Sequence, residues 1–311
     1  MMPPKIPWFL VSGFGAHIKS SPSKLIVVQK NRTREFPIDS INHLLIVGGH
    51  TLHTSAIIHL LKKGVYLSIF EADGTPVSTI RPYSSNKFSK MRELQAEAPR
   101  HRYAVELAGG SIKSRLLFLQ RLEESRGLSL LYKGENEIIH KSLGELEYLI
   151  RLEEIRRIHR LTSDMYYEIL SRAIPPELGY RRRRLQSQQD VVNAMFSIGY
   201  SMLYGNCLVA ILGAHLDPDI GILHEGQGGL VYDLFDPLKA RMIDATVIKV
   251  AAEGISPDDF EISGNRCILS DELVRRLINL FKTSIQVGEI DEQVCSLVHA
   301  LQDHEEFRIL Y

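Results

Sequence analysis

Cysteine is scarce in this chain, and its scarcity excludes several classes of protein. The three cysteines, Cys207, Cys267 and Cys295, are odd in number and lie far apart in the sequence. This distribution argues against a disulfide framework, a thiolate zinc site and an iron–sulfur cluster. We expect all three to be ordinary buried thiols.

Long hydrophobic runs and net charge are also lacking. No apolar run approaches the roughly 18 residues that a membrane-spanning helix needs, and we find no targeting peptide. These absences predict a cytoplasmic protein without a membrane partner. The formal net charge is zero, so the overall charge does not indicate nucleic-acid binding. With 311 residues and 44% hydrophobic composition, the chain is long enough to form two domains.

Lysine is absent between residues 151 and 190, where arginine is abundant. This stretch contains nine arginines, at positions 151, 156, 157, 160, 172 and 181–184. The planar guanidinium suits bidentate contact with phosphate, whereas a merely solvated surface usually mixes in lysine. The run of Arg181, Arg182, Arg183 and Arg184 is the sharpest part of this pattern. It predicts DNA contact, with a solvated loop as the alternative.

The N-terminal third has the short apolar runs and turn residues that are typical of strands. Strands are predicted at 24–30, 35–38, 43–47 and 65–70, with a last one toward Ile80. Residues 54–63 carry apolar side chains at helical spacing behind a Thr54 or Ser55 cap. We therefore expect a small β-rich N-terminal domain with one helix over residues 1–85.

Helical patterning dominates the rest of the chain. Residues 86–102 are polar and without clear period, which predicts a linker. Apolar residues at helical spacing then recur over 103–123, 145–158, 165–174, 191–212, 238–252 and 271–281. The predicted fold class is α+β and multidomain, with a larger all-helical domain over 103–311. The pair Gly109–Gly110 indicates a close packing contact or a kink in the first of these helices.

The stretch from Gly221 to Lys239 holds the residues best suited to bind a metal ion. It places His224, Asp233 and Asp236 around a loop with glycines at 226, 228 and 229, which let the chain turn back sharply. One imidazole and two carboxylates suit divalent cations such as Mn²⁺ or Mg²⁺. A hydrogen-bonded helix cap is the alternative for the same residues.

Five ordered blocks of the chain resemble the Cas1 family of CRISPR adaptation. They are Pro175–Tyr180, the four arginines from 181, Asp190–Tyr200, Gly221–His224 and Val231–Pro237. The likeness runs over nearly the whole chain. It implies the Cas1 fold, in which a small β-rich domain serves dimerisation and a larger helical domain carries catalysis.

The resemblance also implies a third metal ligand, a glutamate seven residues before a tyrosine, and here the chain departs from the family. Counting back seven residues from Tyr166 gives His159. Seven residues turn a helix by about 700°, about 20° short of two turns, so both positions lie on one face. Glu153, Glu154 and Glu168 lie about 120° or more away from that face, so none of them replaces the missing carboxylate.

Two interpretations of His159 follow. In the first, it replaces the glutamate as a ligand beside His224 and Asp236, and Mn²⁺ is favoured because imidazole is a poor ligand for Mg²⁺. In the second, it is an ordinary helix histidine, and the chain is a catalytically weakened or inactive DNA-binding or scaffold subunit. A transposon-borne integrase is a third candidate, but 311 residues leave no room for the additional DNA-reading domains that such proteins usually carry.

For an intact site, the resemblance implies metal-dependent strand transfer in spacer acquisition. The 3′-hydroxyl of a captured DNA fragment attacks the CRISPR repeat at a metal held by His159, His224 and Asp236, and water as nucleophile gives nicking of branched DNA. Asp233 is expected to orient a ligand or a bound water, or to be an auxiliary ligand. Lys239 is expected to neutralise the scissile phosphate.

The remaining expectations concern supporting residues and partners. Asn193 is expected to cap or brace the site. Tyr166, Tyr180 and Tyr200 are expected to pack in the core through their rings and to hydrogen bond through their hydroxyls, with stacking on splayed DNA ends as the alternative. The resemblance implies a homodimer that binds protospacer and repeat DNA and assembles with Cas2. Whether Cas4 joins the complex stays open.

Overall fold

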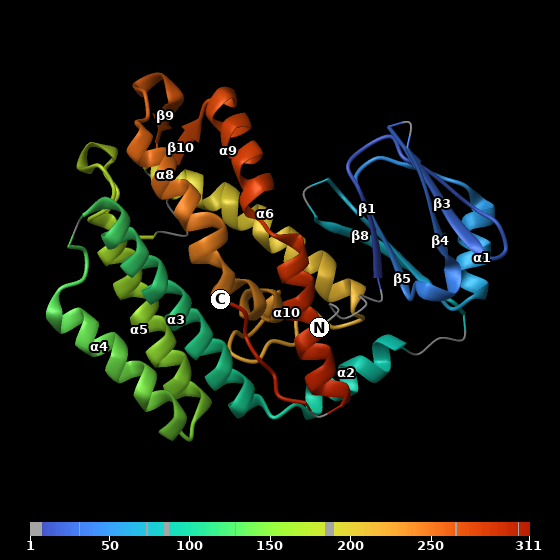
Figure 1. The fold of residues 1–311 in the computed structure, drawn as a ribbon, viewed down its shortest axis with the longest axis horizontal. Coiled ribbons are helices and arrows are strands. Elements are labelled where there is room, and N and C mark those ends of the chain that lie inside the picture. Colours follow the sequence, from blue (N-terminus) through green and yellow to red (C-terminus); the bar gives the residue numbers. More distant parts are fainter. Residues whose placement is uncertain are drawn as a thin grey trace.

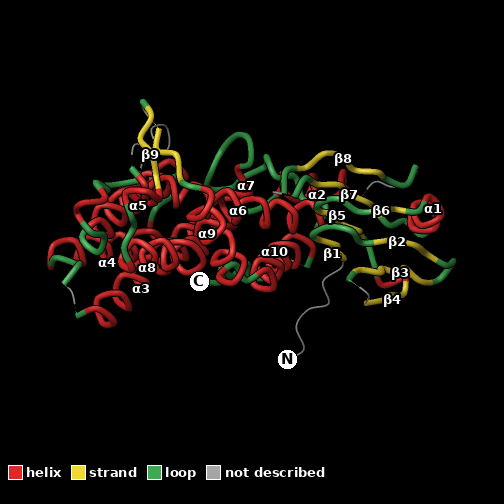
Figure 2. The backbone as a smooth tube through the Cα atoms, turned by 90° about the horizontal axis from the view of Figure 1, so that it is seen from above, coloured by secondary structure: helices red, strands yellow, loops and turns green. Residues whose placement is uncertain are grey.

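A computed structural model describes residues 8–30, 32–72, 74–83, 87–127, 129–183, 190–264, 266–303 and 305–311. Figure 1 shows the β-rich N-terminal part in blue at one end of an elongated molecule, with the helical part occupying the rest. Viewed from above, the sheets and the helical body lie side by side along the long axis (Figure 2).

The described residues of the N-terminal part form two four-stranded sheets. The first has the order β1 (Trp8–Ser12), β5 (His43–Val47), β7 (Tyr66–Phe70) and β8 (Pro76–Ile80), with the first three strands parallel. The second has the order β4 (Arg32–Pro37), β3 (Lys24–Gln29), β2 (His17–Ser20) and β6 (Thr51–Leu52). The apolar run in β5 is buried because parallel strands are covered on both faces.

The strands predicted from short apolar runs and turn residues are confirmed, together with α1 (Thr54–Lys62). Three strands, β1, β2 and β6, were not predicted. The short β2 and β6 carry too few apolar residues to show a period, and β1 forms its strand by parallel pairing with β5, a contact distant in sequence. The domain boundaries themselves stay a prediction.

The predicted linker at 86–102 is wrong in its secondary structure. Residues Lys87–Glu97 form α2, and Arg100–Arg126 form the long helix α3, so most of the segment is helical. The weak apolar period of α2 explains the error, because this helix gains its order from packing against the C-terminal α10 (Val287–Gln302). Its Met91 is buried in the main core.

The larger part is helical but not entirely so. Besides α2, α3 and α10 it contains α4 (Lys133–Glu145), α5 (Leu152–Ser171), α6 (Val191–Gly213), α7 (Gly229–Phe235), α8 (Ala245–Glu253) and α9 (Asp271–Ser284). The two segments predicted as helices at 145–158 and 165–174 both fall on α5 and the turn before it, and α4 was not predicted. The all-helical prediction needs correction, because β9 (Phe260–Ser263) and β10 (Arg266–Leu269) form an antiparallel hairpin. Four-residue strands of mixed polarity leave no clear period.

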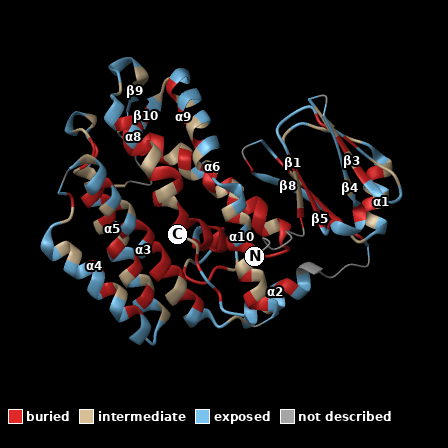
Figure 3. Cartoon of the chain, viewed as in Figure 1, coloured by how far each residue is buried: buried red, intermediate tan, exposed pale blue. Residues whose placement is uncertain are grey.

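Helix α6 runs through the middle of the helical part. Within the described residues it is the one helix long and apolar enough to cross a membrane by length and composition, which the sequence-based expectation had excluded. Its best window is 56% buried inside the protein, and many of its residues belong to the main hydrophobic core. Figure 3 shows the buried residues concentrated along α6 and the helices that surround it.

The two parts of the molecule share a packed contact. Trp8 and Leu45 of the first sheet lie in the same buried cluster as the helical core. Both side chains pack against Gly213 of α6, where an added Cβ would lie within 3.0 Å of each of them. The indole Nε1 of Trp8 donates a hydrogen bond of 3.2 Å to Asp291 on α10. The sheets are therefore anchored to the helical part that carries the site.

The Gly109–Gly110 pair lies in an unbroken α3, and Gly110 is a close packing contact. A Cβ at Gly110 would lie 2.4 Å from Cγ2 of Ile309, whereas one at Gly109 would lie 3.9 Å from Leu146. Gly110→Ala should therefore lower the free energy of unfolding by about 1–3 kcal/mol through overpacking. Gly109→Ala is the matched control and should be neutral or slightly stabilising because alanine favours helix. Urea denaturation that gave equal stabilities for both variants would contradict this assignment.

Candidate functional site

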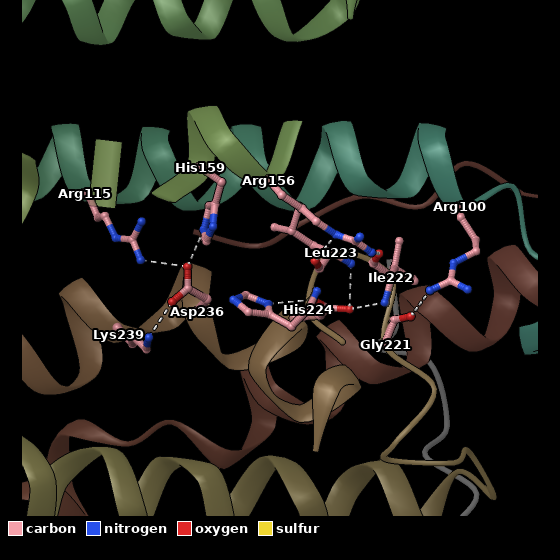
Figure 4. Close-up of polar contacts among 11 residues, drawn as sticks. Arg100, Arg115, Arg156, His159, Gly221, Ile222, Leu223, His224, Asp236 and Lys239 are labelled. Atoms are coloured by element: carbon pink, nitrogen blue, oxygen red, sulfur yellow. Dashed lines mark hydrogen bonds and ion pairs between the residues drawn. The ribbon is translucent and has the colours of Figure 1, made fainter. Parts of the chain in front are cut away.

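The residues of the candidate site come from three separate segments that meet inside the helical part. His159 lies on α5, and the 221–239 segment supplies His224 from its loop, Asp233 from α7 and Asp236 from the following turn η4 (Asp236–Leu238). Arg115 reaches the same place from α3, since α3 packs along both α5 and η4. Figure 4 shows Arg115, His159 and His224 directed toward Asp236, between the two long helices and the loop.

Glycines make the sharp turn before α7 possible. Gly226 and Gly228 have φ values of 85° and 69°, in the left-handed region that favours glycine. A Cβ on Gly221 would lie 2.2 Å from the carbonyl oxygen of His224 and 2.6 Å from the backbone of Gly229, so the two ends of the loop touch. This closure brings His224 back onto the side of α7.

Asp233 holds the returning loop. Its Oδ1 accepts from the backbone N–H of His224 at 2.8 Å, and its Oδ2 accepts from the N–H groups of Ile222 and Leu223 at 2.5 and 3.2 Å. Oδ1 also lies 2.8 Å from Nδ1 of His224, which must donate because the carboxylate can only accept. In the neutral imidazole, Nε2 of His224 is then the acceptor. In Figure 4 this ring extends toward Asp236.

Asp236 is the centre of a buried ion-pair cluster. Its Oδ2 lies 2.7 Å from Nη2 of Arg115 and 2.8 Å from Nε2 of His159, and its Oδ1 lies 2.5 Å from Nζ of Lys239. Burial alone would raise the pKa of this carboxyl, but Arg115 and Lys239 lower it well below its usual value. Asp236 is thus an ionised carboxylate with a donor on every side.

His159 faces Asp236. It is 7% exposed, and burial lowers the pKa of its imidazole against the opposing effect of Asp236. Because Asp236 is ionised, Nε2 of His159 carries the hydrogen that it shares with the carboxylate. The rings of His159 and His224 meet edge to face with their centroids 5.5 Å apart.

A second buried carboxylate lies behind the cluster. Asp244 ends the π-helical turn η5 (Ala240–Asp244) and accepts hydrogen bonds of 2.6 Å from the hydroxyls of Tyr166 and Tyr200. The same two rings lie beside Arg115, at 5.7 Å, and Lys239, at 5.2 Å. These tyrosines therefore bind Asp244 through their hydroxyls and contact, through their rings, the two cations that bind Asp236. Their rings and that of Tyr180 pack in the core, and Tyr166 and Tyr180 are buried. The expected hydrogen bond of the Tyr180 hydroxyl is not confirmed, because this group has no partner among the described residues.

Arg115 and Asp244 were not predicted from the sequence, although a signal exists for both. Arg115 stands on the apolar stripe of α3 that includes Ala108, Ile112 and Leu119. Asp244 likewise interrupts an apolar run. A charged residue on a buried face needs a partner, so its presence there marks a cluster even before the partner is known.

Among the nine arginines between residues 151 and 190, those that the structure describes fall into two groups, those bonded within the protein and those exposed on its surface. Arg156 and Arg172 are bonded to backbone carbonyls and to glutamates, and Arg183 donates to Asn193 and Ser197. Exposed residues remain at positions 151, 157, 160, 181 and 182, and Arg184 lies outside the described residues.

Asn193 is fully buried and braces the arginine loop. Its Nδ2 donates to the carbonyl of Arg182, and its own N–H is capped by Asp190. It thus fixes this loop to the start of α6.

The donor set does not fit the hard divalent ion that the sequence resemblance implies. Among the described residues, no group of three His, Cys, Asp or Glu side chains is arranged to hold a metal ion. Nε2 of His159 is occupied by its hydrogen, and both oxygens of Asp236 already accept from cations or imidazole. Each histidine keeps one ring nitrogen as an acceptor, Nε2 in His224 and Nδ1 in His159, but His159 turns its hydrogen-bearing Nε2 toward Asp236.

Comparisons with known proteins agree on one family. A family model described as CRISPR associated protein Cas1 matches residues 9–283. The putative CRISPR-associated endonuclease Cas1 2 of Methanospirillum hungatei JF-1 is 41% identical over 301 residues, which cover 96% of this chain and 99% of that protein.

Solved structures with a similar fold include the following two. A casposase bound to integration product matches with a TM-score of 0.81 and 23% identity over 97% of each chain. A partial Cas6-RT-Cas1–Cas2 complex contains a chain that matches with a TM-score of 0.78 and 17% identity, over 97% of this chain and 98% of that one. At these identities the two matches establish the shared architecture.

The buried Asp244 gives stability a pH dependence of definite sign. Burial raises the pKa of its carboxyl to about 6 from a usual value of 3.8. Between these values the folded state binds more protons than the unfolded state, so stability falls as the pH rises from about 4 to about 6. Relative to Asp244→Asn, the wild type should lose on the order of 3 kcal/mol across this interval.

Urea unfolding of both proteins from pH 4 to pH 7 measures this difference. Asp291, whose pKa is also raised to about 6, is present in both proteins and cancels in the comparison. Parallel stability curves for the two proteins would show that Asp244 does not titrate in this range.

Proposed function

Since the chain belongs to the Cas1 family, we propose that it acts on DNA as an integrase and endonuclease of CRISPR adaptation. The observation that carries the proposal is that His159 of α5 meets His224, Asp236 and Lys239 of the 221–239 segment at one centre. The relatives support the activity class: one is named an endonuclease, and another is a casposase bound to an integration product.

The scissile phosphate would approach the centre from the side of His224 and Lys239. These side chains are 34% and 16% exposed, whereas Asp236 and Arg115 are nearly inaccessible. Lys239 would offset the charge of the phosphate. Nε2 of His224, with Nδ1 held by Asp233, is suited to accept the proton of an attacking 3′-hydroxyl. In this proposal His224 therefore carries the chemistry, and Asp236 positions Lys239.

The partners follow from the same family. DNA and Cas2 are the partners that the similar structures support, through an integration product and a Cas1–Cas2 complex. The homodimer, Cas4 and the cytoplasmic location stay predictions. A divalent ion, Mn²⁺ or Mg²⁺, also stays a prediction, and the occupied oxygens of Asp236 argue against it.

A second candidate function is a DNA-holding scaffold subunit without catalysis. The neutralisation of Asp236 by Arg115 and Lys239 favours it, because a family centre that has lost its free carboxylate would retain the DNA surface and lose the chemistry. Strand transfer by the purified protein separates the two functions.

His224→Ala should reduce strand transfer of a 3′-hydroxyl DNA fragment onto a repeat duplex by about 10²-fold or more, since it removes the proposed proton acceptor. DNA affinity should change little. The matched control is His140→Ala, an exposed histidine on α4, which should retain activity. Wild-type protein that binds DNA but joins no strands would establish the scaffold function instead.

The arginines that stay exposed should dominate DNA affinity. Changing both Arg181 and Arg182 to Gln should weaken binding uniformly across sequences and reduce the slope of log K against log salt by about 2. Arg121 and Arg275, exposed on other helices, give a control pair with the same change in net charge. Equal loss of affinity in both pairs would mean that overall charge, rather than this loop, governs binding.

A further inference from the structure

We propose that the centre around Asp236 is closed by the protein's own cations and excludes a divalent ion, with Arg115 and Lys239 in its place. The inference deepens the proposed function, because it concerns the same centre and rests on its role in DNA chemistry. It begins from the disagreement between the donor set and the ion that the family resemblance implies.

Arg115 is committed to Asp236. Its Nη2 donates to Oδ2 of Asp236, and among the described residues its Nε and Nη1 have no hydrogen-bond partner. The side chain is only 4% exposed, so water gives little compensation. If a metal ion took Asp236, a guanidinium that cannot lose its charge would be left buried without a counter-ion.

Lys239 closes the other side of the carboxylate. Its Nζ lies 2.5 Å from Oδ1 of Asp236, and it also lies over the rings of Phe235 and Tyr200, at 4.5 and 5.2 Å. These aromatic faces stabilise the ammonium where it is. Both oxygens of Asp236 thus have partners that are themselves held in place.

A closed ring of contacts fixes both cations. From Asp236 it passes through Lys239 to Tyr200, then through Asp244 and Tyr166 to Arg115, and so back to Asp236. Two carboxylates and two cations balance within it. An added divalent ion would leave an excess positive charge in a buried region whose nearest uncharged ligands are two imidazoles.

His159 completes the exclusion. A glutamate at this position would add a second carboxylate beside Asp236, and one of the two could then serve a metal while the other kept Arg115. With histidine there, Asp236 is the one carboxylate that Arg115, Lys239 and His159 share. The same substitution that removes a metal ligand therefore removes the negative charge that would attract the metal.

Binding of Mn²⁺ alone to the purified full-length protein tests the proposal. The loss of the free Mn²⁺ electron paramagnetic resonance signal is measured for the wild type, for His224→Ala and for the double variant Arg115→Met with His159→Glu. We expect no His224-dependent binding in the wild type. The double variant should bind one Mn²⁺ per chain with an affinity at least about tenfold higher than that of the wild type. Arg121→Met with His140→Glu, both exposed, is the control pair and should match the wild type.

Two results would overturn the proposal. One is a wild-type site for one Mn²⁺ per chain that His224→Ala abolishes. The other is a double variant that folds, as judged by circular dichroism, and still binds no ion. If the double variant does not fold, His159→Glu alone takes its place with the same expected direction. DNA binding and strand transfer in EDTA, measured on the same preparations, test the proposed function independently of this result.

Discussion

The ionised carboxylate of Asp236 is the constraint on which the helical part of this protein depends. A buried carboxylate is tolerated when cations and hydrogen-bond donors surround it, and here they come from three elements. Arg115 extends from α3, His159 from α5 and Lys239 from the turn after η4. Satisfying one charge therefore fixes the positions of these three elements relative to one another.

The π-helical turn links this centre to the core behind it. A π turn shifts the residues after it relative to the preceding helix, and such turns recur at functional sites. Here the turn places Asp244 next to Tyr166 and Tyr200, and its carboxylate accepts hydrogen bonds from their hydroxyls. The rings of those tyrosines in turn lie against the two cations of Asp236. The same residues therefore pack the core and set the electrostatics of the site.

The sequence predicted those parts of the site that depend on local geometry. The glycine-rich loop indicated a reversal. The resemblance to the Cas1 family indicated the position seven residues before Tyr166, and helix periodicity placed both positions on one face; His159 lies there, next to Asp236. The partner of Asp236 across the centre could not be predicted in the same way, because Arg115 lies 121 residues away from it. The helix α2 was missed for a similar reason, since its order comes from packing against α10.

Histidine at position 159 changes the charge balance of the centre as well as its set of possible metal ligands. A carboxylate there would face Arg115 and Lys239 together with Asp236, so the two acids would balance the two bases and leave Asp244 as surplus negative charge. With an imidazole whose pKa is lowered by burial, balance is reached only when Asp244 is counted. Asp244, although it lies behind the site and touches neither histidine ring in the described contacts, therefore becomes part of the electrostatics of the centre. The tyrosines that connect it to Arg115 and Lys239 are the physical route for that effect.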